Sequence, residues 1–443
     1  MPNITFIGAG SVVFAQKLLG DILSFPALED SEITLMDVDP DRLEQTTTVA
    51  QRTVEEADLS ATIESTTDRR AALADADYVL NMIHVGGREP FENEIQIPES
   101  FGVNQAVGDT MGPGGVFRLL RTYPAMLEIA RDMEVVCPDA VLLNYTNPMA
   151  MLCWAIDEAT DVDIYGLCHS VQGTAAAIAD YVDVPPAELE YVVAGINHMA
   201  WFLEATSDGE SVYPELRAAV ADPDTFDRDN VRFELLDHFG SFVTESSHHM
   251  SEYVPYFRTS EDLIDEYVVD RDLEGTRNHW MPTGRYFEHW CEYQAENEAR
   301  DFTEERFEIE RSHEYGAHII HSIETGTPRR MNINVRNDTT AIANLGDDAC
   351  VEVPCLVDGT GVRPCSVGEL PPQLAALCRS NIAVQRLAVE GAIQQELELV
   401  RQAIKLDPLT AAACSLDEID EMIDTLIEAN APYLPESIVA EVG

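Results

Sequence analysis

The first 37 residues carry the pattern that most restricts what this chain can fold into. Residues 3–7 are apolar, residues 8–11 contain two glycines, and residues 12–23 place apolar side chains at helical spacing. A second apolar stretch, residues 32–36, ends at Asp37. A strand, a glycine turn, a helix, a strand and an acid in this order are typical of a βαβ unit that binds a dinucleotide. The pattern therefore predicts a Rossmann-type fold at the N-terminus.

The residues expected to bind the cofactor are Gly8, Gly10, Ser11 and Asp37. Glycines let the backbone approach a pyrophosphate, and the N-terminus of the following helix stabilises its negative charge. Asp37 is placed to accept hydrogen bonds from ribose hydroxyls, which favours NAD over NADP. Val13 stands where a third glycine is usual. The glycine pair alone is therefore weak evidence for dinucleotide binding, and the strands on either side strengthen it.

Later apolar stretches extend the predicted sheet. Residues 76–82 and 140–145 are typical of buried strands and are separated by helical stretches, an alternation that implies parallel strands. At 443 residues the chain is too long for one ordinary core, so we expect two domains. We predict an α/β protein with an NAD-binding Rossmann-type parallel sheet over residues 1–165. A larger mixed α/β (α+β) domain for catalysis, metal binding and oligomerisation would follow over residues 166–443.

Two polar residues are expected at the carboxyl edge of this sheet, where open α/β folds bind ligands. Residues 107–115 are too rich in glycine for a regular element and predict a loop. Asp109 in this loop would hold a substrate hydroxyl or support a metal, or else cap a helix that begins near Val116. Asn147 follows the strand at 140–145, and its amide suits sugar hydroxyls unless it only shapes a turn.

Cys168 and His198 are the strongest candidates for a metal site. They lie about 30 residues apart, each in its own short motif, residues 166–173 and residues 194–200. A thiolate and an imidazole are soft to borderline ligands that suit a divalent transition metal. The alternative is a buried thiol and a histidine satisfied within the core.

The charge of the chain excludes some partners. Its formal net charge is −53, from 80 acidic and 27 basic residues spread along the whole length. Such a surface repels a phosphate backbone, so we expect no nucleic-acid partner. No stretch excludes charge for the roughly 18 residues of a membrane span, and the chain starts in a strand, not in a signal peptide. Salt would screen the self-repulsion, so we expect a salt-adapted, cytoplasmic protein.

These motifs together resemble glycoside hydrolase family 4, the NAD- and manganese-dependent glycosidases, and most closely its α-galactosidase branch. The resemblance covers essentially the full length of the chain and rests on residues 4–11, 35–37, 112–115, 144–151, 166–174, 195–200, 242–247 and 335–338. The Cys-His-Ser-Val-Gln-Gly block at 168–173 is its most specific part.

The resemblance implies roles for the candidate residues. Cys168 and His198 would be the protein ligands of manganese, and Asn147 and Asp109 would bind substrate. Family members that cleave phosphorylated glycosides usually carry an arginine near the position of Phe91, and an aspartate where this chain has His169. Both differences point to an unphosphorylated α-hexoside, most simply an α-galactoside.

The mechanism that the resemblance implies is oxidation at sugar carbon 3 by NAD, elimination, addition of water and re-reduction, with no net redox change. Family 4 is an exception to the two-carboxylate scheme of most glycosidases. His169 suits general-acid help to the leaving group, because imidazole titrates near neutrality. For the base we favour Tyr253, with His249 and Glu252 as alternatives, unless this polar cluster only lines an interface.

Other functions compete with this interpretation. Within the family, α-galacturonidase and α-glucosidase activities remain open. Outside it, the chain would be an NAD-dependent dehydrogenase of a sugar or a 2-hydroxy acid, or a non-catalytic NAD sensor. Long helical stretches, such as the amphipathic residues 385–406, lead us to expect a homo-oligomer, a dimer or a tetramer.

Overall fold

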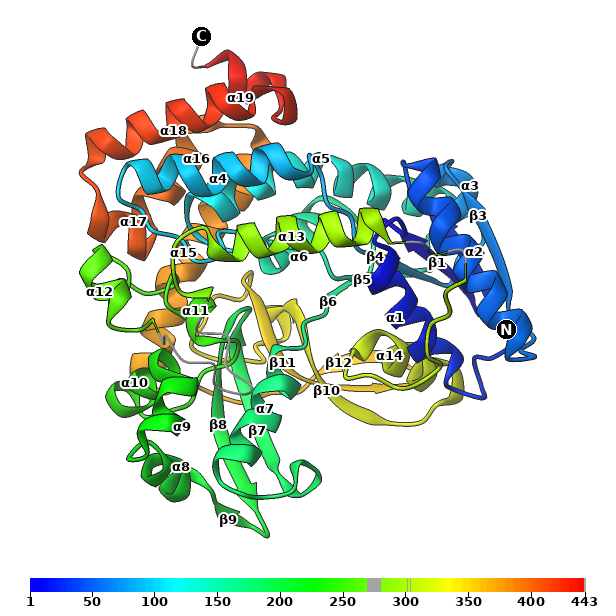
Figure 1. Cartoon of the computed structure of the whole chain (residues 1–443), viewed down its shortest axis with the longest axis horizontal. Helices are drawn as coiled ribbons and strands as arrows, with labels where there is room; N and C mark the ends of the chain where they lie inside the picture. Colours follow the sequence, from blue (N-terminus) through cyan, green and yellow to red (C-terminus); the bar gives the residue numbers. More distant parts are fainter. Residues whose placement is uncertain (269–279, 301, 303, 442–443) are drawn as a thin grey trace.

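One mixed sheet organises the molecule. The computed structural model describes residues 1–268, 280–300, 302 and 304–441. Twelve strands form a single sheet in the order β3-β2-β1-β4-β5-β6-β10-β11-β7-β8-β9, with β12 paired to β11 (Figure 1). The sheet therefore continues from the N-terminal half of the chain into the C-terminal half.

The first six strands form the expected parallel sheet. They are β1 (Asn3–Ile7), β2 (Glu32–Met36), β3 (Thr62–Thr66), β4 (Tyr78–Asn81), β5 (Val141–Asn144) and β6 (Ile164–Gly166). All pairings among these six strands are parallel. β4 is buried at every residue, as expected for strands covered on both faces. The helices of this half are α1 (Val12–Leu23), α2 (Pro40–Glu56), α3 (Arg69–Leu73), α4 (Arg88–Ser100), α5 (Gly112–Val136) and α6 (Met149–Ala159).

The remaining strands are antiparallel and come from the C-terminal half. They are β7 (Glu190–Ile196), β8 (Met199–Ser207), β9 (Glu210–Ser211), β10 (Arg329–Arg336), β11 (Cys350–Asp358) and β12 (Gly361–Pro364). β10 joins the parallel part through the pair Asn334 and Gly166 on β6, and β11 joins β7 through Glu352 and Gly195. The predicted mixed α/β fold is confirmed. The division at residue 165 falls within β6 and stays a prediction.

Helices of the C-terminal half complete the layers. They are α7 (Ser170–Tyr181), α8 (Tyr213–Ala219), α9 (Pro223–Arg228), α10 (Asn230–Phe239), α11 (Ser247–Met250), α12 (Glu261–Asp265), α13 (Arg285–Ala299), α14 (Tyr315–Thr325), α15 (Pro372–Gln394), α16 (Leu397–Leu406), α17 (Pro408–Ala413), α18 (Leu416–Asn430) and α19 (Glu436–Ala440). α13 and α18 pack on α4, and α15 packs on α5 and α6. In Figure 1, α4, α5, α16 and α18 lie above the strands, and α8, α9 and α10 lie at the lower left.

Two expectations about helices are wrong. α5 begins at Gly112, not near Val116. The missing side chains of Gly114 and Gly115 permit this start, because a Cβ on either would lie 2.4 Å from backbone atoms of the loop that precedes the helix. Residues 385–406 are not one helix, because the chain turns at Gln395, whose φ is 55°, and α16 folds back against α15.

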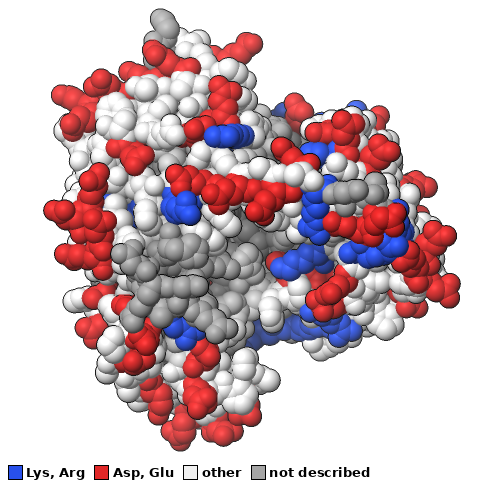
Figure 2. All heavy atoms as spheres, viewed as in Figure 1, with Lys and Arg blue, Asp and Glu red and all other residues white. Residues whose placement is uncertain are grey.

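Acidic side chains are scattered over the face seen in Figure 2 and are dense along its rim, and basic ones form small clusters among them. The charge is thus distributed over a folded surface, as the sequence predicts. Within the described part of the chain, no helix has both the length and the apolar character to cross a bilayer.

Candidate active site

Cys168 and His198 come together from two different elements. Cys168 follows β6 and precedes α7, while His198 lies in the turn between β7 and β8. Both are buried, with 8% and 5% of their surface exposed. Because β10 and β11 connect β6 to β7 in one sheet, the two residues, about 30 positions apart in sequence, meet at one place.

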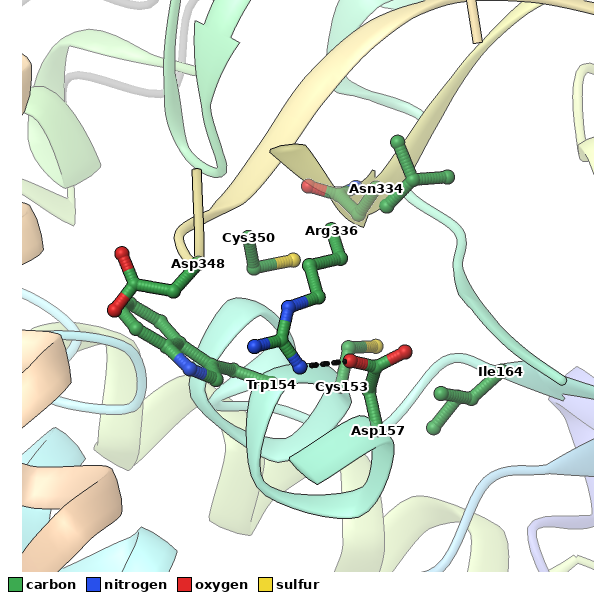
Figure 3. A pocket seen from close by; sticks show the side chains of 9 residues that line it. Cys153, Trp154, Asp157, Ile164, Asn334, Arg336, Asp348 and Cys350 are labelled. Atoms are coloured by element: carbon green, nitrogen blue, oxygen red, sulfur yellow. Dashed lines mark hydrogen bonds and ion pairs between the residues drawn. The ribbon is translucent and has the colours of Figure 1, made fainter. Parts of the chain in front are cut away.

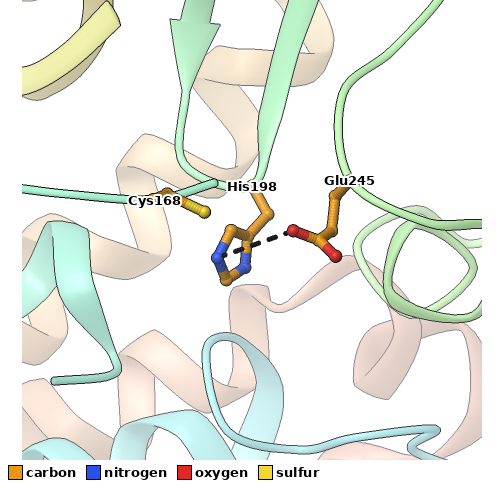
Figure 4. A group of neighbouring side chains, drawn as sticks. All are labelled: Cys168, His198 and Glu245. Atoms are coloured by element: carbon orange, nitrogen blue, oxygen red, sulfur yellow. Dashed lines mark ion pairs between the residues drawn. The ribbon is translucent and has the colours of Figure 1, made fainter. Parts of the chain in front are cut away.

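Glu245 is a third member of this group, and sequence reasoning did not single it out. Donor atoms of Cys168, His198 and Glu245 all lie within 4.8 Å of one another (Figure 4). The distance from His198 Nε2 to Glu245 Oε2 is 4.0 Å. Glu245 follows a short pairing of Val243 with Trp201 of β8, which brings this segment to the turn that holds His198. A sulfur, a nitrogen and an oxygen donor together suit a divalent transition metal.

The His198 ring is held from its other side. Its Nδ1 lies 3.2 Å from the Tyr253 hydroxyl and 3.4 Å from Thr110 Oγ1. Histidine ligands of metals are usually oriented in this way by a hydrogen bond to the second ring nitrogen. The arrangement leaves Nε2 to face Glu245.

The electrostatic surroundings of Cys168 fit a cation. Burial raises the pKa of the Cys168 thiol well above its ordinary value, and the carboxylates of Glu245 and Glu352 raise it further. A thiolate is needed for metal binding, and a bound cation compensates the negative charges that otherwise disfavour it. The donor set is therefore suited to a metal and poorly suited to an isolated thiolate.

Asp109 and Asn147 meet beside this group. Asn147 Nδ2 donates to Asp109 Oδ2 at 3.0 Å, and Arg118 Nη1 lies 3.5 Å from the same oxygen. Burial acts to raise the pKa of Asp109, but Arg118 and two nearby histidines outweigh it and lower that pKa. The alternative role of Asp109 as a helix cap is wrong, because Met111 is the N-cap of α5. Asn147 Oδ1 is buried and has no protein partner, so it can accept from a substrate hydroxyl.

The three candidates for the base have different surroundings. Glu252 accepts from the backbone amides of Ala106, Val107 and Gly108 at 2.7, 3.0 and 3.2 Å, so it anchors the loop before Asp109. These bonds occupy its carboxylate and argue against Glu252 as the base.

Tyr253 and His249 each contact a member of the group formed by Cys168, His198 and Glu245. Burial raises the pKa of Tyr253 well above its ordinary value, and its hydroxyl contacts His198. His249 Nδ1 lies 3.4 Å from Glu245 Oε1 and 3.0 Å from Ser246 Oγ.

His169 lies next to Cys168 but on the solvent side. Its side chain is 59% exposed, and Nδ1 is 3.8 Å from Glu314 Oε1. It lines a cavity of about 190 Å³ together with residues of α7, α10 and the segment 245–247. His169 can therefore reach a molecule that enters this cavity beside Glu245.

The glycine turn predicted to bind NAD lies at the carboxyl end of β1. Gly8 has a φ of 91°, and a Cβ there would lie 2.9 Å from the backbone nitrogen of Ile83. Asp37 Oδ2 accepts from the Gly10 amide at 2.7 Å. Ser11 precedes α1 without a capping hydrogen bond from its side chain. The turn shares its sheet edge with the ends of β5 and β6, where Asn147 and Cys168 follow.

A second cavity lies elsewhere and is too small for a ligand. It is lined by residues of α6, β10 and β11 around the ion pair of Arg336 Nη1 and Asp157 Oδ2 at 2.7 Å (Figure 3). Its volume of about 10 Å³ is close to the least that a single water needs.

Comparison with known proteins gives the family. Residues 3–184 match the model described as Family 4 glycosyl hydrolase, and residues 193–410 match its C-terminal domain. An α-galactosidase of Bacillus subtilis (strain 168) is 43% identical over 98% of this chain and 100% of its own length. An α-galactosidase of Rhizobium meliloti (strain 1021) is 37% identical over 98% of this chain and 89% of its own.

Solved structures agree with the fold. The 6-phospho-β-glucosidase of Thermotoga maritima, determined with manganese, NAD+ and glucose-6-phosphate, superposes with a TM-score of 0.78. The superposition covers 98% of this chain and 99% of that one, at 20% identity. The family resemblance predicted from the motifs is confirmed, and the chain belongs to glycosyl hydrolase family 4.

Proposed function

We propose that this protein is an NAD- and manganese-dependent α-galactosidase that hydrolyses unphosphorylated α-galactosides. The observation that carries the proposal is the meeting of Cys168, His198 and Glu245 at the sheet edge that also bears the glycine turn. The names of the relatives at 43% and 37% identity support the galactoside as substrate.

The binding residues follow from this geometry. Gly8, Gly10, Ser11 and Asp37 would hold NAD. The backbone of Met82 and Ile83, just after β4, leaves no room for a Cβ at Gly8, so glycine keeps this turn tight at the sheet edge where dinucleotides bind. Cys168 and His198 would hold manganese. Asn147 would hold a sugar hydroxyl through Oδ1, which has no protein partner. Asp109 already accepts from Asn147 and Thr110, and would accept from a sugar hydroxyl through a remaining lone pair of its carboxylate.

NAD, when bound, supplies a reversible hydride transfer at sugar carbon 3, and a divalent metal supplies Lewis acidity at the substrate oxygens. The chain itself must remove the proton from carbon 2 and protonate the glycosidic oxygen. If Nε2 of His198 bound the metal, Nδ1 would carry the proton and would donate to the Tyr253 oxygen, which lies 3.2 Å away. Burial raises the pKa of Tyr253, and a proton donated by Nδ1 would act in the opposite direction by stabilising the phenolate. This opposing effect supports Tyr253 as the base.

His169 is proposed to protonate the leaving oxygen. It lines the cavity beside Glu245 and is exposed, so it can exchange protons with solvent between turnovers.

The proposal is tested by a hydrolysis assay with NAD, manganese and a reductant, in about 3 M KCl so that the acidic surface is screened. The substrates are p-nitrophenyl α-galactoside, α-glucoside and α-galacturonide, because relatives at 28% and 26% identity are named α-glucosidase and α-galacturonidase. We expect nitrophenol from the galactoside only when NAD and manganese are both present, without accumulation of NADH. Stoichiometric NADH without cleavage would indicate the dehydrogenase instead.

We also propose that the protein works as a homo-oligomer, a dimer or a tetramer, in a salt-rich cytoplasm. The long outer helices α15 and α18 and the net charge of −53 support these two proposals. Light scattering across a range of KCl concentrations tests the first, and the salt dependence of activity tests the second.

A further inference from the structure

We propose that Glu245 is a third protein ligand of the metal, fixed in place by a buried network on α7 and α10. The inference rests on the proposed function, because it concerns the metal that Cys168 and His198 would hold. It adds an anionic oxygen donor to a thiolate and an imidazole.

The distances are close to those of donors that share one ion. Two ligand atoms at roughly 2.0–2.3 Å from a common ion lie at most about 4.6 Å apart. His198 Nε2 and Glu245 Oε2 are 4.0 Å apart, and all three donors lie within 4.8 Å. Small rotations of the side chains would bring the group to ligating geometry. Figure 4 shows the Cys168 sulfur and the Glu245 carboxylate on either side of the His198 ring.

The two carboxylate oxygens of Glu245 have separate surroundings. Oε2 faces His198 Nε2, while Oε1 lies 3.4 Å from His249 Nδ1. Metal-ligating carboxylates commonly bind the ion through one oxygen while an outer residue holds the other. His249 is therefore placed to orient Glu245 as a ligand through one oxygen.

The backbone of Glu245 is held in an uncommon conformation. Its φ is 72°, in the left-handed region that side chains other than glycine seldom adopt. Such residues persist where the surroundings hold them and occur often at functional sites. Here Arg232 Nη1 donates to the Glu245 carbonyl oxygen, and Thr174 Oγ1 donates to the same oxygen at 3.4 Å.

Arg232 itself is buried and fully engaged. Its Nη1 also donates to Thr174 Oγ1 at 2.9 Å, its Nε donates to Asp229 Oδ1 at 2.8 Å, and its Nη2 pairs with Asp229 Oδ2. Thr174 belongs to α7, the helix that directly follows Cys168. The network thus ties the segment of Glu245 to the element that positions the cysteine ligand.

A carboxylate donor changes what the site prefers. Thiolate and imidazole alone suit zinc and other late transition metals, whereas carboxylates suit manganese and magnesium. A thiolate and a carboxylate also neutralise a divalent cation. Glu245 therefore shifts the site towards manganese, and its loss should weaken manganese more than zinc.

The test is direct metal binding to the chelator-stripped full chain without NAD or substrate. Binding of Mn²⁺ is followed by electron paramagnetic resonance and calorimetry, and Zn²⁺ binding by competition with a chromophoric chelator. Wild type is compared with Glu245→Gln, Cys168→Ser and the exposed control Glu204→Gln. We expect Glu245→Gln to raise the Kd for Mn²⁺ at least tenfold and the Kd for Zn²⁺ less, and Glu204→Gln to change neither.

A second variant tests the same network without removing the Glu245 carboxylate, in case the Glu245→Gln protein does not fold. Thr174→Val keeps Glu245 and its charge but removes one hydroxyl from the network, and should weaken Mn²⁺ binding by a smaller factor. Thermal unfolding in chelator establishes whether each variant is folded. Unchanged Mn²⁺ affinity in a folded Glu245→Gln protein, with affinity lost in Cys168→Ser, would overturn this inference and leave the proposed function intact. Unchanged affinity in Cys168→Ser as well would overturn the metal site of the proposed function.

Discussion

At the scale of single residues, the site contains a buried polar atom that has no hydrogen-bond partner in the protein. The amide nitrogen of Asn147 donates to Asp109, and its buried Oδ1 has no protein partner. Buried polar atoms of this kind cost free energy unless a ligand completes them. The partnerless oxygen supports the proposed role of Asn147 in substrate binding.

Replacement of Asn147 by Ala should therefore impair substrate binding without unfolding the protein. Loss of one hydrogen bond in a buried site is worth about 1–3 kcal/mol, or roughly 5- to 150-fold in kcat/KM. The measurement is steady-state kinetics with p-nitrophenyl α-galactoside. The control is Asn344→Ala, which removes a hydrogen-bonding amide outside the site. A kcat/KM within twofold of wild type would exclude a substrate role for Asn147.

Single residues also show where sequence reasoning stopped. Cys168 and His198 stood in recognisable motifs, and the structure brings them together. Glu245 was one of 80 acidic residues, and its value as a ligand arises only from a turn of backbone that the pairing of Val243 with Trp201 brings to His198. No spacing rule relates positions 168, 198 and 245, so the fold alone reveals the third donor.

At the scale of elements, periodicity located strands and helices better than it located their ends. β1, α1 and β2 have the predicted bounds. α5 starts earlier than predicted, because Gly114 and Gly115 serve close contact with the preceding loop and not flexibility. The break between α15 and α16 occurs at Gln395, a residue type that carries no helix-stop signal.

One helix cap gives a pH dependence opposite to that of most carboxylates. Asp407 caps α17, accepts from the Thr410 amide at 2.9 Å and hydroxyl at 2.7 Å, and is fully buried. Burial raises its pKa from 3.8 to about 6. The folded state thus holds a proton that the unfolded state releases between about pH 4 and 6, so this group contributes stability below about pH 4 that is lost as pH rises through 6.

Asp407→Asn should remove that dependence. A shift of about two pKa units corresponds to about 3 kcal/mol, so the free energy of unfolding of the variant should rise relative to wild type by up to that amount from pH 4 to pH 7. Denaturant titrations in chelator at both pH values measure it, with the exposed Asp417→Asn as the matched control. A difference between variant and wild type that is independent of pH would contradict the expectation.

At the scale of the whole molecule, charge governs stability. A net charge of −53 repels itself, and the Debye length falls from about 10 Å at 0.1 M salt to about 3 Å at 1 M. The midpoint of thermal unfolding should therefore rise as KCl increases from about 0.1 to 1 M. Calorimetry of wild type and of the exposed double variant Glu44→Lys, Glu64→Lys measures this, and the variant should respond less steeply. Highest stability at low salt would contradict a repulsive surface.

The continuous sheet is the feature that sequence reasoning missed at this scale. The sequence of the N-terminal strands matches a complete dinucleotide-binding unit, so the sequence predicts a second domain after it. The division at residue 165 stays a prediction. The sequence of β10 does not indicate that it pairs with β6, because the paired residues, Asn334 and Gly166, are far apart in the chain.

The pairing of β10 with β6 has a consequence for the synthesis of the protein on the ribosome. β6 ends at Gly166, and the strand that covers its edge begins only at Arg329, about 160 residues later. At roughly 5–20 residues per second, the nascent chain waits on the order of ten seconds with an open, unpaired strand edge. Such edges recruit other chains. The partly synthesised chain is therefore the stage most exposed to aggregation, and a chaperone that binds nascent chains would protect it most during that interval.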